Sequence, residues 1–143
     1  MTIARILKSK GTHAAFVSPD AKIADVIAEL ESEDVGALVV SADGQSIDGI
    51  ISERDIVRGL QEFGHSVLDH EVYDLMTKDV FTCTSSDFIA GIMAAMHDRG
   101  IRHVPVIDNG ELAGIVSIRD IVKLRLDEVL AEAEAMRAYI NSG

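Results

Sequence analysis

Aromatic residues, cysteine and positive charge are all scarce in this chain. Aromatic side chains make up 4% of the 143 residues and tryptophan is absent, so few rings could stack on nucleic-acid bases. Lysine and arginine number 13 against 24 acidic residues, and the net charge of −11 opposes binding to a phosphate backbone. Cys83 is the only cysteine, which excludes an intrachain disulfide and a cysteine zinc cluster. We therefore expect no nucleic-acid partner and a reducing compartment.

Long apolar runs are also missing. None approaches the ~20 residues of a membrane helix, and the opening MTIARILKSKG lacks the apolar core of a secretory signal. The five histidines show no metal-ligand spacing of the H-E-x-x-H kind. With 48% apolar and 26% charged residues, the composition predicts a soluble, cytoplasmic, globular protein with neither a metal site nor a membrane partner.

What the sequence does contain is an internal repeat of about sixty residues. Three pairs of segments match in the same order, at offsets of 65 or 66 residues: GIISERDIV (49–57) with GIVSIRDIV (114–122), DVGALVV (34–40) with GIRHVPV (100–106), and VSPDAKIADVIAEL (17–30) with CTSSDFIAGIMAAM (83–96). Two copies, rather than a longer array, suggest a pseudo-twofold pair whose functional surface lies between the copies.

Each copy is predicted to form β-α-β-β-α, which gives a mixed α/β (α+β) fold. First strands are expected at His13–Val17 and Val80–Cys83. Ser18-Pro19 and a capping box from Thr84 to Asp87 predict the starts of the helices that follow. The expected organisation is repeat 1 at 3–64, a linker at 65–72, repeat 2 at 73–126 and a C-terminal helical extension at 127–143.

An S-x-R-D motif closes the second predicted strand of each copy, at 52–55 and 117–120. The plainest interpretation is a capping box, in which serine and aspartate satisfy free amides of the next helix. The repeated arginine favours a further role, because a cation opposes the helix dipole there unless an anion binds. A carboxylate suits a ribose diol, and serine, amides and arginine suit a phosphate. The residues alone leave both interpretations open.

The paired motifs, the run Ile101–Val106 and the Met76-Thr77 that opens the second copy resemble tandem CBS domains, named after cystathionine β-synthase. The resemblance extends over roughly Ile3 to Leu126. It implies two pseudo-twofold related repeats packed as one Bateman module. Such modules bind adenosine ligands in clefts between the repeats, among them AMP, ADP, ATP, NAD(H), S-adenosylmethionine and cyclic dinucleotides. The pairs often dimerise into a flat disc.

The resemblance also implies ligand-binding roles for individual residues. Ribose is assigned to Asp55 and Asp120. Phosphate is assigned to Ser52, Arg54, Ser117, Arg119, Arg102 and His103. Backbone or base contacts are assigned more weakly to Lys10, Gly11, Gly36, Ala37, Thr77, Lys78, Val80 and Pro105.

The two copies differ at the basic pair. Arg102 and His103 of the second copy align with Gly36 and Ala37 of the first. The first copy thus lacks these side-chain donors, and we expect the two clefts to differ in affinity or in ligand.

The function predicted is a regulatory module that senses AMP, ATP or NAD(H) and signals through conformation or assembly, with no catalytic residues or catalytic cofactor. The alternatives are an adaptor with vestigial clefts and an enzyme, for which no catalytic motif exists. A homodimer formed through the repeats and an unidentified protein target are the expected partners. At the C-terminus, Leu126, Leu130, Ala133 and Ile140 share one helix face, which is either an oligomer contact or a solvated helix.

Overall fold

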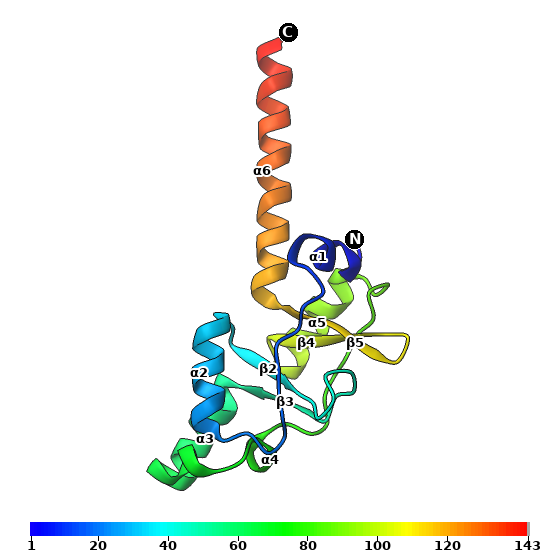
Figure 1. Ribbon diagram of the computed structural model, residues 1–143. Coiled ribbons are helices and arrows are strands. Elements are labelled where there is room, and N and C mark those ends of the chain that lie inside the picture. Colours follow the sequence, from blue (N-terminus) through cyan, green and yellow to red (C-terminus); the bar gives the residue numbers. More distant parts are fainter. Residues whose placement is uncertain (143) are drawn as a thin grey trace.

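The computed structural model describes residues 1–142, a two-part α/β body with one long helix projecting from it (Figure 1). The helices are α1 (Ile3–Lys10), α2 (Ile23–Glu33), α3 (Glu53–Phe63), the 3-10 helix η1 (Gly64–Asp69), α4 (Val72–Leu75), α5 (Ile89–Arg99) and α6 (Ile118–Ser142). The strands are β1 (Phe16–Val17), β2 (Ala37–Val40), β3 (Gly49–Ser52), β4 (His103–Asp108) and β5 (Glu111–Ser117).

Two small sheets reproduce the repeat in three dimensions. In the first repeat, β2 pairs in parallel with β1 and antiparallel with β3. In the second repeat, β4 pairs antiparallel with β5. The strand predicted at Val80–Cys83 is reduced to one parallel bridge between Cys83 and Val106. The predicted strand was too long, because within it only Cys83 bonds to β4. Cys83 N donates to Pro105 O, and Cys83 O accepts from Ile107 N.

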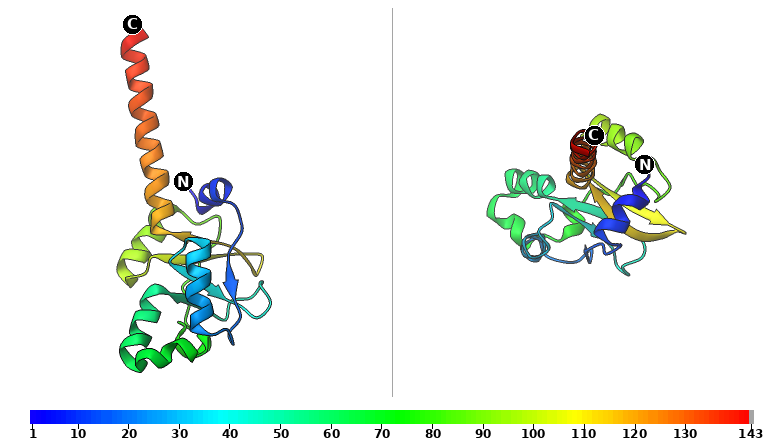
Figure 2. Two further views of the ribbon diagram at one scale, coloured as in Figure 1. Left: turned by 60° about the vertical axis from the view of Figure 1, so that its left-hand side comes forward. Right: turned by 90° about the horizontal axis from the view of Figure 1, so that it is seen from above.

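Each repeat has its own apolar core, and each core also includes side chains from another part of the chain. The first joins α2, β2 and β3 to Val67, Val72 and Met76. The second joins α5, β4, β5 and the start of α6 to the α1 residues Ile3, Ile6 and Leu7. The N-terminal segment of each repeat therefore packs on the other repeat, and α1 lies beside the base of α6 (Figures 1 and 2). The repeat boundaries remain a prediction, since the packing crosses them.

Backbone hydrogen bonds fix this exchange. Val72 N donates to Ala21 O over 2.8 Å and Ile23 N to His70 O over 3.0 Å. Around the second repeat, Ile3 N donates to Asp87 O over 2.9 Å. These bonds hold the chain extended just ahead of α2 and α5, where a helix would need the same backbone groups.

The two predicted helix starts were wrong for this reason. Helix α2 begins at Ile23 after Lys22, and Ser18-Pro19 forms a turn with Ala21 N donating to Ser18 O. Helix α5 begins at Ile89, while the Asp87 carboxylate accepts from Thr84 N in the turn before it. Helices α2 and α5 end at Asp34 and Gly100, and both of these residues are in the left-handed conformation.

Helix α6 continues without a break for 25 residues, from the second S-x-R-D motif through the predicted extension. Its first turns pack on the body through Ile121 and Leu124, residues as far as Glu132 line a groove with Met1 and Phe88, and the last turns stand clear of the body (Figure 2). Among residues 1–142, none of the helices is long and apolar enough to cross a membrane.

Candidate functional site

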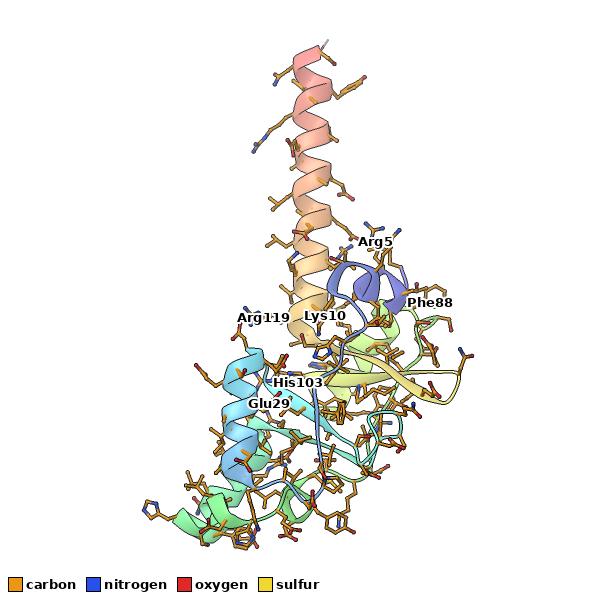
Figure 3. The ribbon with its side chains drawn as sticks, viewed as in Figure 1. Arg5, Lys10, Glu29, Phe88, His103 and Arg119 are labelled. Carbon is orange, nitrogen blue, oxygen red and sulfur yellow. The ribbon has the colours of Figure 1, made fainter. Side chains whose placement is uncertain are left out.

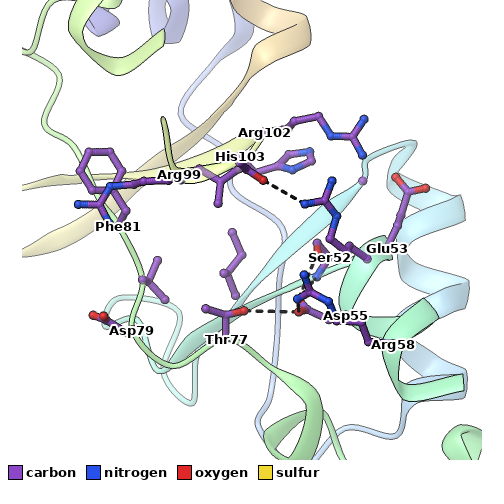
Figure 4. Close-up of a pocket in the computed structure, with 16 residues that line it drawn as sticks. Ser52, Glu53, Asp55, Arg58, Thr77, Asp79, Phe81, Arg99, Arg102 and His103 are labelled. Carbon is purple, nitrogen blue, oxygen red and sulfur yellow. Dashed lines mark hydrogen bonds and ion pairs between the residues drawn. The ribbon is translucent and has the colours of Figure 1, made fainter. Parts of the chain in front are cut away.

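A cleft of about 330 Å³ lies where the first S-x-R-D motif faces the second repeat (Figure 4). It is lined by Gly36, Ile50, Ser52, Glu53, Arg54, Asp55, Arg58, Thr77, Asp79, Val80, Phe81, Arg99, Gly100, Ile101, Arg102 and His103. The lining combines the start of α3, the chain between the repeats, and the junction of α5 with β4. Both repeats are therefore needed to form it.

Asp55 forms the floor of the cleft and is 9% exposed. Its Oδ2 accepts from Ser52 N over 2.9 Å and from the Ser52 hydroxyl over 3.1 Å, which completes the predicted capping box. Its Oδ1 has only longer contacts, 3.4 Å to the Thr77 hydroxyl and 3.8 Å to Arg58. One carboxylate oxygen thus holds the helix start, and the other is weakly engaged and lies in the cleft lining.

Arg54 links the two repeats across the cleft. Its guanidinium donates to Gly100 O over 3.1 Å, the dashed contact below the β4 strand in Figure 4. Beside it, Gly36 allows a close approach, because a Cβ there would lie 3.2 Å from the His103 ring and 2.5 Å from Glu53. At these aligned positions, the second copy has the basic Arg102. The first copy has Gly36, whose lack of a side chain leaves room for the His103 ring.

The side of the cleft formed by the second repeat is basic. Arg99 lies 4.3 Å above the Phe81 ring, and Arg102 and His103 follow at the start of β4. Four arginines line the cleft against three carboxylates, although the chain as a whole carries −11. Burial, then the charges of Arg102 and Lys10, lower the pKa of His103 below its ordinary value, which leaves the ring neutral near pH 7.

The second S-x-R-D motif has the same cap but a different neighbour. Asp120 Oδ2 accepts from Ser117 N and the Ser117 hydroxyl, and also from Lys10 Nζ over 2.8 Å. Lys10 donates in addition to Ile115 O over 2.9 Å, so it lies against both the motif and the strand before it. Burial opposes ionisation of Asp120, but the bonds from Lys10 and Ser117 outweigh it and hold the pKa below its usual range.

The structure therefore divides the predicted site residues into three groups. The first cleft gathers Ser52, Arg54, Asp55, Gly36, Thr77, Val80, Arg102 and His103. Around the second motif lie Ser117, Asp120 and Lys10. Outside the first cleft lie Arg119 and Gly11, both exposed, Ala37 and Pro105, both buried in strands, and Lys78, whose amine lies 4.0 Å above the Tyr73 ring.

One expectation about the clefts was reversed. The alignment grouped Arg102 and His103 with the second motif, but folding brings them to the first, because β4 faces the start of α3. Sequence reasoning also missed Arg58 and Arg99. Arg58 follows Asp55 by one helical turn, a usable signal. Arg99 lies in the last turn of α5, and nothing in its local sequence indicates that it lines a cleft.

Comparison with known proteins agrees with this architecture. The family model for the CBS domain matches twice, at residues 9–62 and 72–127. The chain belongs to the CBS-domain family. Among solved structures, the CBS-domain containing protein of Agrobacterium tumefaciens is 38% identical, with a TM-score of 0.84 over 87% of this chain and 99% of that one.

Two further relatives bear on this CBS pair. The mitochondrial CBS domain-containing protein CBSX3 of Arabidopsis thaliana is 35% identical over 99% of this chain and 73% of its own length. A CBS domain protein of Pyrobaculum aerophilum, solved in complex with AMP, is 28% identical, with a TM-score of 0.72 over 84% of this chain and 89% of that one. The expectation of a cytoplasmic protein is not confirmed and stays a prediction.

Proposed function

We propose that this CBS pair is a regulatory module that binds an adenine nucleotide, with AMP, ATP and NAD(H) as the candidates, in the cleft at Asp55. The observation that carries the proposal is the composition of that cleft. A buried carboxylate with one weakly engaged oxygen lies opposite a set of arginines, within a volume suited to a small ligand. The similar protein from Pyrobaculum aerophilum, crystallised with AMP, supports the ligand class.

The residues divide the work by chemistry. Asp55 Oδ1 and the Thr77 hydroxyl would bond to the ribose diol, since a carboxylate accepts from both hydroxyls. Arg54, Arg99 and Arg102 would bind phosphate, because a guanidinium presents a planar fork of donors to its oxygens. Ile50 and Val80 would supply apolar contact to the base.

We expect the cleft to serve regulation because residues of both repeats line it. A ligand that contacts α3 and the start of β4 together would favour one relative packing of the two repeats. It can shift that packing only by binding one arrangement more tightly than the other. A partner protein or the assembly state would then report nucleotide levels. An adaptor with unused clefts is the competing function.

The second S-x-R-D motif offers a matched control for the test. Asp55→Asn and Asp120→Asn weaken the same capping box in the two repeats, but only the first alters the open cleft. We expect Asp55→Asn to lower affinity for the best of AMP, ATP, NAD⁺ and NADH by tenfold or more, and Asp120→Asn to leave it within about twofold. Isothermal titration calorimetry on ligand-stripped protein measures both.

Two results would contradict the proposal. Absence of binding by all four nucleotides to folded, ligand-free protein would favour the adaptor. If both variants lose the same melting temperature and keep their nucleotide affinity, then Asp55 only caps its helix and does not bind the ligand.

A further inference from the structure

Helix α6 presents an unpartnered apolar seam along the length that stands clear of the body. Its packed side is the opposite one, where Ile121 and Leu124 contact the second core. On the outer side lie Val122, Leu126, Val129, Met136 and Ile140, between 52% and 68% exposed. Figure 3 shows the upper turns of α6 projecting with no other part of the chain beside them.

The spacing of that seam is that of a coiled coil. Six apolar residues follow one another at alternating intervals of four and three, the a and d positions of a heptad: Val122, Leu126, Val129, Ala133, Met136 and Ile140. An ordinary surface helix has a broader stripe turned to its own core. A strict a/d seam on the far side indicates a second helix as the occupant.

The charges beside the seam identify that helix and its direction. Glu132 lies at a g position and Arg137 at the following e position, and neither is in an ion pair within residues 1–142. In a parallel pair of identical helices, each Glu132 faces the partner's Arg137. In an antiparallel pair with the seam in register, Glu132 meets the partner's Glu132 and Arg137 meets the partner's Lys123. Only the parallel arrangement places opposite charges together.

We propose that α6 pairs in parallel with α6 of a second copy of this chain, as a short two-stranded coiled coil from Val122 to Ile140. The seam has just under three heptads, and Ala133 fills one layer poorly, so the helices alone would associate weakly. Dimerisation through α6 is therefore reversible and depends on protein concentration.

The first test is a charge exchange, followed by sedimentation equilibrium of the full chain. Glu132→Arg and Arg137→Glu each create like-charge contacts across the dimer, and each should raise its dissociation constant roughly tenfold. The double variant restores opposite pairs and should return the constant to within about twofold of the wild type. Both sites are exposed, and circular dichroism checks that each variant is folded.

Direction is tested with Ile140→Cys under mild oxidation. Parallel helices bring the two new thiols together, whereas antiparallel ones in register hold them roughly 27 Å apart at 1.5 Å per residue. Cys83 is buried, and burial with nearby Asp87 and Asp108 raises its pKa to about 12, so it does not compete. A covalent dimer is expected. A protein that stays monomeric at every concentration, a dimer indifferent to all charge variants, or no cross-link in a dimer would each overturn the proposal.

Discussion

Two aspartates in closely similar local sequences have different surroundings. Asp55 and Asp120 each accept from the serine three residues earlier, as the capping box requires. What differs is the side chain that the other repeat brings to each aspartate. The Thr77 hydroxyl lies 3.4 Å from Asp55, and the Lys10 amine lies 2.8 Å from Asp120. The motif predicts the cap in both copies, and distant residues decide what else each carboxylate can bind.

At the same scale, His103 predicts a pH dependence of nucleotide affinity. The pKa of its ring is lowered by burial, then by Arg102 and Lys10, and a bound phosphate would favour the protonated form. Binding then takes up a proton, so affinity gains as pH falls from about 7.5 to 6, through the range where histidine titrates. The gain should be absent in His103→Gln.

Calorimetry at several pH values measures this effect as the ratio of wild-type to His103→Gln affinity. The phosphate of the ligand also titrates near pH 6, but it does so equally in both proteins and cancels in the ratio. A ratio that stays flat with pH would mean that His103 does not contact the phosphate.

At the scale of the elements, two helical glycines predict opposite effects of one substitution. A Cβ on Gly59 in α3 would collide with the Leu75 side chain and lie 2.9 Å from Val67, which is fully buried. A Cβ on Gly91 in α5 would meet nothing within 4 Å. Gly59→Ala should destabilise the protein by about 1–3 kcal/mol through overpacking. Gly91→Ala should stabilise it by about 0.5–1 kcal/mol through helix propensity.

Urea unfolding of the two variants beside the wild type measures this difference. Stabilisation by both substitutions would show that α3 and α4 are not in close contact, and that Leu75 moves aside at little cost.

The elements themselves show how far local sequence determines the fold. Apolar residues recur at helical spacing along α2 and α5, and Asp34 and Gly100 end these helices in the left-handed conformation. Between β4 and β5, Asn109 and Gly110 both have positive φ, which this dipeptide accommodates easily in a tight turn. The helix starts could not be predicted, because the backbone near Ala21 is held by Val72, about fifty residues away.

For the whole molecule, the surroundings of the two S-x-R-D motifs differ, and a difference between them in affinity or ligand stays a prediction. Arg99 and Arg102 reach the first cleft across the pseudo-twofold axis, and their counterparts in the alignment are Glu33 and Gly36. No property of either residue reveals which motif it will face, since that depends on how two repeats pack. The second motif instead receives Lys10 from α1.

Lys10 occupies Asp120, whereas the cleft at Asp55 is open. We therefore predict that the wild-type protein binds one nucleotide per chain and that Lys10→Met binds two. Methionine keeps the apolar stem but frees Asp120 from the amine, so the calorimetric stoichiometry should rise from one toward two. Lys8→Met, exposed on the same helix, is the control and should leave it at one. Two sites in the wild type, or one in Lys10→Met, would show that Lys10 does not close the second cleft.

The same variant has a stability signature. Because the pKa of Asp120 is lowered in the folded protein, its ion pair stabilises the fold above the ordinary range of that carboxyl and is lost as pH falls through the lowered value. The melting temperatures of wild type and Lys10→Met should therefore differ at neutral pH and converge in acid.

Because the N-terminal segment of each repeat packs on the other repeat, the two cores must form in a definite order while the chain is being synthesised. The first core cannot close until Val72 and Met76 have left the ribosome, shortly after the end of the first repeat at residue 64. Helix α1 is translated before β4 and β5, and it can dock only when Val104 and Val116 have been made. Helix α1 thus emerges long before it can dock, and its apolar face stays exposed to chaperones until the second repeat has been made.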